Sequence, residues 1–180
     1  MKKKKQHLII EITLVLSIIF LIGCTENTEK NGSNNLQYLN EEYSFGLNPP
    51  EGWFVDENSS LIIVNFYIPA GKSVASLSVM KPVTLKNGET LKNLTEQALE
   101  EYPTLMENFT LISSNERTIN GMNAYEIVYN FSQGNYTFVR KEVPIQKNDK
   151  IFTILYSIIQ SSYNTFEDVV DHSIDSFTIT

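Results

Sequence analysis

Residues 120–159 read NGMNAYEIVYNFSQGNYTFVRKEVPIQKNDKIFTILYSII, and this segment carries the clearest fold signal in the chain. The apolar side chains at 125, 127, 129 and 131 form one face of a strand, opposite Glu126 and Asn130. Turn residues at 133–135 and 147–150 separate this strand from two more, at 136–145 and 151–159. Three consecutive strands joined by short turns predict an antiparallel meander.

The flanking sequence predicts shorter strands. Ala75, Leu77 and Val79 alternate with serines, which indicates one buried face and one wet face. Pro144 has no N–H to donate, so we expect it near the end of its strand or at a bulge. These additional strands are predicted at residues 43–47, 53–55, 61–68, 75–79 and 109–113.

Two helices complete the predicted architecture. Residues 89–102 place Leu91, Leu94 and Tyr102 on one apolar stripe, and we expect Pro103 to end this helix. A closing helix is predicted to begin at Ser162 or Asn164 and to run to about Asp175. Two helices and about seven mostly antiparallel strands predict an α+β sandwich. The expected inward face of the closing helix is Phe166, Val169, Val170, Ser173, Ile174 and Phe177.

The composition excludes several classes of function. The 180 residues carry 14 basic and 21 acidic side chains, a formal charge of -7, which disfavours nucleic acid as a partner, because phosphate binding needs clustered Lys and Arg. The single cysteine excludes an intrachain disulfide, a CxxC redox pair and a Cys-rich zinc site. We predict no cofactor.

The first 23 residues have the composition of an export signal. Four lysines follow Met1, and residues 12–22 are almost purely apolar. Leu21, Ile22, Gly23 and Cys24 then resemble the lipobox of prokaryotic lipoproteins, which implies cleavage before Cys24 and a diacylglyceryl group on its thiol. One alternative is an ordinary signal peptide with an incidental cysteine. A transmembrane anchor is disfavoured, because residues 8–22 would span roughly 22 Å of a ~30 Å hydrocarbon core.

The predicted organisation is therefore a signal peptide (1–23), a lipidated cysteine with a flexible tether (24–40) and one domain (41–180). The tether is rich in asparagine and has few apolar residues. Four basic residues and one acidic residue lie in the signal, so the exported part has ten basic and twenty acidic side chains and a charge of -10. We expect the lipid to hold this acidic domain at the outer face of the cell membrane or of another envelope membrane.

Three segments resemble the PsbP-like family. They are Tyr43–Trp53 (YSFGLNPPEGW), Asn120–Glu126 (NGMNAYE) and Phe166–Phe177, so the likeness covers nearly the whole expected domain. The resemblance implies a central antiparallel sheet flanked by helices, the PsbP-like α/β/α sandwich. These residues mark a fold and are not catalytic.

The family includes lumenal photosystem subunits, a Ran-binding nuclear-import factor of similar fold and many prokaryotic lipoproteins. Docking onto something larger is the property they share. The lipid anchor and the single histidine of the exported part depart from the photosynthetic members. Oxygen evolution therefore does not follow from the resemblance, and no metal-binding residue is carried over.

Few residues outside the signal are candidates for chemistry. His172 is the only remaining histidine, and a helical wheel places it on the outer flank of the closing helix. Trp53 could lie on a binding rim, although a core anchor after the first turn is favoured. The acidic sets at 41–42, 100–101 and 168–175 lack EF-hand spacing, so we assign no metal and no catalytic residue.

These features together predict a membrane-anchored extracytoplasmic lipoprotein. Its domain is expected to act as a non-catalytic binding or assembly module for a protein or an envelope component. One alternative is an accessory lipoprotein that binds a small ligand or a divalent cation, and another is a hydrolase. The partner and the oligomeric state are not encoded in any motif of the chain.

Overall fold

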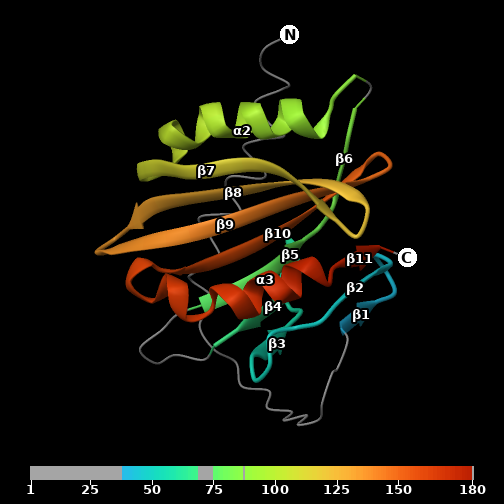
Figure 1. The fold of residues 1–180 in the computed structure, drawn as a ribbon, viewed down its shortest axis with the longest axis horizontal. Helices are drawn as coiled ribbons and strands as arrows, with labels where there is room; N and C mark the ends of the chain where they lie inside the picture. The colour runs from blue at the N-terminus through green and yellow to red at the C-terminus, as the bar shows by residue number, and fades with distance from the viewer. Residues whose placement is uncertain (1–37, 69–74, 87, 180) are drawn as a thin grey trace.

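The computed structural model describes residues 38–68, 75–86 and 88–179. The predicted signal peptide, the lipobox Leu21–Cys24 and most of the tether lie outside the described residues. The described part contains one large sheet, one small sheet, two α-helices and a short 3-10 helix (Figure 1). The α+β architecture predicted from the sequence is confirmed.

The large sheet has eight strands, one more than the approximate number predicted. They are β3 (Phe54–Asp56), β4 (Ile62–Tyr67), β5 (Ala75–Met80), β6 (Val83–Thr84), β7 (Glu107–Ile119), β8 (Met122–Gln133), β9 (Tyr136–Lys147) and β10 (Lys150–Ile159). Their order is β3-β4-β5-β10-β9-β8-β7, with β6 beside β10, and all pairings are antiparallel. The predicted meander is therefore the centre of the fold.

Strands β7 and β8 are longer than the strands predicted at 109–113 and 125–131, because both continue to the tight turn at Asn120 and Gly121. Both residues have positive φ, 47° and 78°, which a two-residue hairpin turn of type I′ requires. Pro144 pairs with Thr153 of β10, but the pairing of β9 with β8 is interrupted beside it, between Ile145 and Glu142. The proline thus lies near the end of β9, at a break in one ladder, as expected for a residue without N–H.

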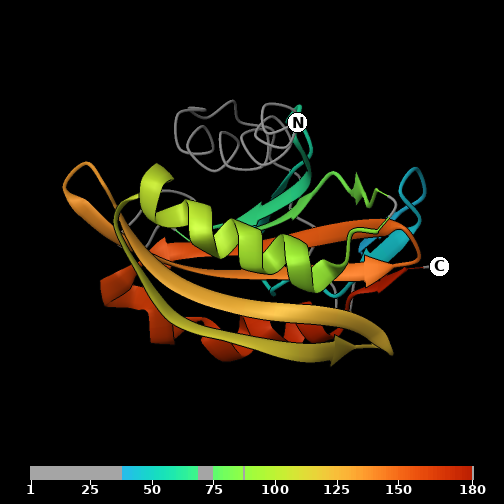
Figure 2. The same ribbon diagram turned by 90° about the horizontal axis from the view of Figure 1, so that it is seen from above.

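The α-helices flank opposite faces of the meander (Figure 2). Helix α2 (Leu91–Leu105) begins after Thr90, whose Oγ1 accepts the N–H of Asn93 at 3.1 Å. The prediction that Pro103 ends this helix is wrong, because Pro103 lies inside its last turn. There the proline removes one intrahelical N–H, and its restricted φ is compatible with a helix.

The closing segment is not one continuous helix. A 3-10 helix, η1 (Gln160–Thr165), comes first, and α3 (Glu167–Asp175) starts after Phe166. The predicted caps Ser162 and Asn164 therefore lie inside η1. The first turn of α3 has Glu167 and Asp168, whose negative charges suit a helix N-terminus.

Hydrophobic core occupies both faces of the large sheet, because alternate side chains of a strand point to opposite faces. Val170, Ile174 and Phe177 belong to the main core together with residues of β4, β5, β9 and β10. A second cluster lies under α2 and consists of Tyr102, Ile127, Tyr129, Phe131 and Phe138. Helices α2 and α3 thus each cover their own core.

The small sheet corrects the predicted start of the domain. It contains β1 (Tyr38–Asn40), β2 (Phe45–Leu47) and β11 (Thr178–Ile179), with β2 in the middle. The assignment of residues 24–40 to the tether is wrong at its end, since Tyr38–Asn40 pair with β2. The ring of Tyr38 packs edge-on against Phe66, which fixes β1 to the large sheet.

Candidate functional site

A pocket of about 450 Å³ lies between the large sheet and the segment formed by η1 and α3. Its volume falls within the range of roughly 300–1,000 Å³ that is typical of ligand sites. Strands β7, β8 and β9 provide one wall, and η1 with the start of α3 provides the other. The lining residues are Ile112, Ser113, Glu126, Val128, Asn130, Val139, Lys141, Gln160, Tyr163, Asn164 and Glu167.

A β-bulge in β7 directs two adjacent side chains to this pocket. Leu111 pairs with Tyr129 and Ser113 pairs with Val128, so β7 has one residue more than β8 at this point. The extra residue is Ile112, and both Ile112 and Ser113 line the pocket. Ile112 is 55 % exposed and lies on a terminal strand of the sheet. The bulge therefore places an exposed apolar side chain at the rim.

Lys141 lies in the pocket wall with its ammonium group directed at α3. Its Nζ donates to Oδ1 of Asp171 and lies 3.6 Å from Oε1 of Glu167. The side chain of Lys141 is 3 % exposed, whereas those of Glu167 and Asp171 are 38 % and 37 % exposed. A solute that enters the pocket therefore meets carboxylates before it meets the ammonium group.

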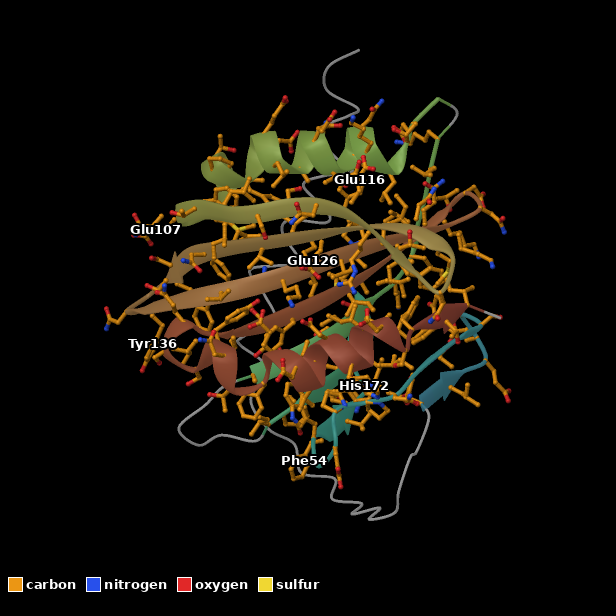
Figure 3. All side chains as sticks on the ribbon, viewed as in Figure 1. Phe54, Glu107, Glu116, Glu126, Tyr136 and His172 are labelled. Atoms are coloured by element: carbon orange, nitrogen blue, oxygen red, sulfur yellow. The ribbon has the colours of Figure 1, made fainter. Side chains whose placement is uncertain are left out.

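A second cation is shared between two carboxylates beside the first. Arg117 of β7 donates through Nη1 to Glu126 and through Nη2 to Asp175. Figure 3 shows Glu126 over the middle strands of the large sheet. Lys141 pairs with Glu167 and Asp171, and Arg117 pairs with Glu126 and Asp175, so four carboxylates surround two cations. These six side chains therefore carry a formal net charge of -2, and Glu126, Lys141 and Glu167, the three of them that line the pocket, carry -1.

Two further polar groups of the pocket have defined environments. The Tyr163 hydroxyl donates to Oε1 of Glu167 at 3.1 Å. Burial, followed by the charge of Glu167, raises the pKa of Tyr163 above its ordinary value of 10.0, so this hydroxyl remains a donor at neutral pH. Oδ1 of Asn130 is buried and accepts no hydrogen bond from the described residues.

On the opposite face of β9, Arg140 and Glu142 are buried under α2. The hydroxyls of Tyr102 and Tyr129 donate to Oε2 of Glu142 at 2.8 and 3.2 Å. The guanidinium carbon of Arg140 lies 4.7 Å from the ring centroid of Phe131. Burial raises the pKa of Glu142 above its ordinary value, while the two hydroxyls and Arg140 oppose the shift. Because this network is enclosed in the second core, we assign it a structural role.

The sequence matches a family model over most of its length. The model of PsbP-like proteins matches residues 12–179. The chain belongs to the PsbP-like family. No curated protein matches the chain.

Solved structures share the fold of this PsbP-like domain. The cyanobacterial PsbP of Synechocystis sp. PCC 6803 superposes with a TM-score of 0.61 at 17% identity, covering 86% of this chain and 98% of that chain. LpqN of Mycobacterium tuberculosis, described as involved in cell envelope biogenesis, gives 0.60 at 16% identity, covering 82% and 91%. The Ran-binding protein Mog1p of Saccharomyces cerevisiae gives 0.58 at 10% identity, covering 82% and 96%. At these identities the likeness concerns the fold alone.

His172 and Trp53, two of the residues singled out from the sequence of this PsbP-like protein, do not line the pocket. His172 is exposed on α3 and does not line the pocket (Figure 3). The half-buried ring of Trp53 packs edge-on against Phe166 at a centroid distance of 5.8 Å, which gives it a core contact. A binding-rim role for Trp53 stays a prediction. Cys24 lies outside the described residues.

The part of the chain that the structure describes contains neither a cluster of metal-ligating side chains nor a membrane-spanning helix. In residues 38–68, 75–86 and 88–179, His, Cys, Asp and Glu form no group of three or more that could hold a metal ion. Within the same residues, no helix is long and apolar enough to cross a membrane. Three of the acidic residues of α3, Glu167, Asp171 and Asp175, instead make ion pairs with Lys141 and Arg117.

The pocket residues Glu126, Lys141 and Glu167 were missed by reasoning from the sequence. One signal was available, because Arg140, Lys141 and Glu142 are three consecutive charges in the middle of an apolar strand. Charged side chains are seldom buried unless they are paired, so a charged run at that position indicates partners on both faces of the sheet. The identity of those partners depends on how α2 and α3 pack, which no local pattern states.

Proposed function

We propose that this PsbP-like protein is a membrane-anchored extracytoplasmic lipoprotein whose domain is a non-catalytic binding module. The pocket beside the outermost strand β7 is the observation that carries the binding role, because a polar cavity there adjoins an exposed apolar side chain, Ile112. The lipobox at Leu21–Cys24 supports the anchor. The partner is a protein or a component of the cell envelope.

The contacts of the pocket favour binding over catalysis. A general base needs a carboxylate or imidazole that is available to take a proton from a substrate. Glu126 is instead engaged by Arg117, and Glu167 is engaged by Lys141 and Tyr163. His172 is exposed and is not among the residues that line the pocket. Two structural neighbours, LpqN with its role in envelope biogenesis and the Ran-binding Mog1p, support an assembly role by analogy of fold.

The anchor is tested by mass spectrometry of the protein purified from its membranes, beside a Cys24→Ser variant. We expect a mature chain that starts at Cys24 and carries two acyl chains, since a single chain gives only marginal membrane binding. The serine variant should remain unprocessed, because it lacks the thiol that accepts the lipid. An unmodified Cys24 in a mature chain would contradict the anchor and leave an ordinary signal peptide.

The binding role is tested by affinity capture from detergent-solubilised membranes, with two variants of β7. Ser113→Trp fills the pocket, whereas Thr118→Trp adds the same bulk at an exposed position of the strand outside the pocket. We expect the wild type and Thr118→Trp to retain the same partner in constant proportion and Ser113→Trp to lose it. Equal recovery with all three proteins would contradict a role for this pocket.

A further inference from the structure

We propose that the pocket binds a lysine or arginine side chain presented by a partner protein. This inference rests on the proposed binding function and adds to it the chemistry of the partner. It is carried by the charges around the cavity, by the difference in exposure between its anions and its cation, and by the apolar rim on β7.

Charge complementarity favours a cation as occupant. Lys141 and Arg117 are each shared between two carboxylates, which leaves an excess of two negative charges in this cluster and of one among the residues that line the pocket. An ammonium or guanidinium group would replace solvent at Glu126 and Glu167 and would balance part of that excess. An anion would instead have to approach Lys141 past the more exposed carboxylates of Glu167 and Asp171.

The hydrogen-bonding groups of the wall also suit a donor. Oδ1 of Asn130 accepts no hydrogen bond from the described residues, and a buried acceptor without a donor is costly. Ammonium and guanidinium groups carry three and five N–H donors and no acceptor. Asn164 and Gln160 contribute further side-chain amides to the same cavity.

The surroundings of the pocket favour a protein side chain over a free amine. Ile112 at the rim is 55 % exposed, and Leu111, which precedes it in β7 and pairs with Tyr129 of β8, is also exposed. These apolar groups can be covered only by a partner that extends beyond the pocket. Strand β7 is terminal in the sheet, so an extended segment of the partner can lie along it while one basic side chain enters the cavity.

Isothermal titration of the full chain in detergent micelles with two capped peptides tests the proposal. One peptide has two lysines among leucines, and the other has glutamates in place of the lysines. We expect saturable binding of the lysine peptide only. Equal binding of the glutamate peptide, or binding of neither peptide, would overturn the proposal.

Neighbouring residues on α3 provide matched variants. Glu167→Gln and Asp168→Asn remove the same charge, but only Glu167 lines the pocket, and Asp168 is exposed. We expect Glu167→Gln to weaken binding of the lysine peptide by about fivefold, because a partly exposed charged hydrogen bond is lost. Asp168→Asn should leave the affinity within about twofold, in keeping with the small effect of exposed charges.

A second pair guards against a folding defect. Glu126→Gln should weaken binding as Glu167→Gln does, whereas Glu116→Gln, an exposed position of β7 outside the pocket, should not. Equal weakening by the pocket and control variants would show a general attraction to an acidic chain and overturn the proposal.

Competition with a free amine is a further test. Full displacement of the lysine peptide by equimolar spermidine would show that the pocket prefers a free amine to a side chain of a protein, and this would also overturn the proposal. The two proposals can also fail separately. If Ser113→Trp still abolishes capture of the partner, but the two peptides bind equally, this inference is overturned and the proposed binding function is retained.

Discussion

Three consecutive residues of β9 divide their charges between the two faces of the sheet. Arg140 and Glu142 are buried with the tyrosines under α2, while Lys141 reaches the acidic residues of α3. The alternation of a strand makes this division obligatory. Glu142 accepts a hydrogen bond from Tyr102 of α2, Arg140 donates to Ser157 of β10, and Lys141 donates to Asp171 of α3. Strand β9 therefore links the structural network of one face to the candidate site of the other.

The hydroxyl of Tyr102 stabilises the network under α2. We expect Tyr102→Phe to lower the free energy of unfolding by about 1–2 kcal/mol, because the buried carboxyl of Glu142 loses a donor at 2.8 Å. Tyr136→Phe is the matched control, since Tyr136 is exposed at the start of β9 (Figure 3), and it should change stability by less than about 0.5 kcal/mol. Chemical denaturation measures both. Equal stability of the two variants would contradict the role of the hydroxyl.

Glu142 should give the stability of the protein a distinct pH dependence. Its pKa is raised in the folded state, chiefly by burial, so the unfolded state releases the proton first as the pH rises. The contribution of this group to the free energy of unfolding therefore falls as the pH increases above its ordinary value of 4.5. Glu142→Gln removes the titration and keeps an acceptor for the tyrosines. Denaturation curves from pH 4 upward should show the wild type losing stability relative to the variant, and parallel profiles would contradict this assignment.

Elements with a regular pattern were predicted well, and elements that depend on tertiary packing were not. The meander follows from turns such as Asn120-Gly121, whose positive φ angles are a local requirement. The bulge at Ile112 and the break between η1 and α3 leave no such local mark. The exposure of Val169 was also misjudged, because this residue lies at the margin of the apolar stripe of α3.

Adjacent valines of α3 test how this helix is seated on the sheet. Val170 is fully buried and Val169 is 43 % exposed. We expect Val170→Ala to cost about 2 kcal/mol, because two methyl groups leave the core and a cavity remains. Val169→Ala should cost less than about 0.5 kcal/mol. Thermal unfolding of the two variants measures the difference. A larger loss of stability for Val169→Ala than for Val170→Ala would contradict the packing of α3 described here, in which Val170 faces the sheet.

The molecule as a whole joins segments that are distant in the sequence. The pocket combines β7, β8 and β9 with η1 and the start of α3, so its lining runs from Ile112 to Glu167. The fold class and most strands could be predicted from local periodicity, but this cavity could not, because it exists only after α3 has docked. The acidic charge of residues 24–180, in contrast, was evident from composition, and the pocket is one place where acidic side chains gather.

Site-specific photo-crosslinking in the producing cells tests the binding role most directly. A photoreactive phenylalanine analogue is placed at Ile112 on the pocket rim and, as controls, at the exposed residues Tyr136 and Phe54, which lie outside the pocket (Figure 3). A binding module that uses the pocket predicts one adduct of defined mass from position 112, abolished when Ser113→Trp fills the cavity, and little adduct from the controls. Adducts from Tyr136 or Phe54 with none from position 112 would contradict it.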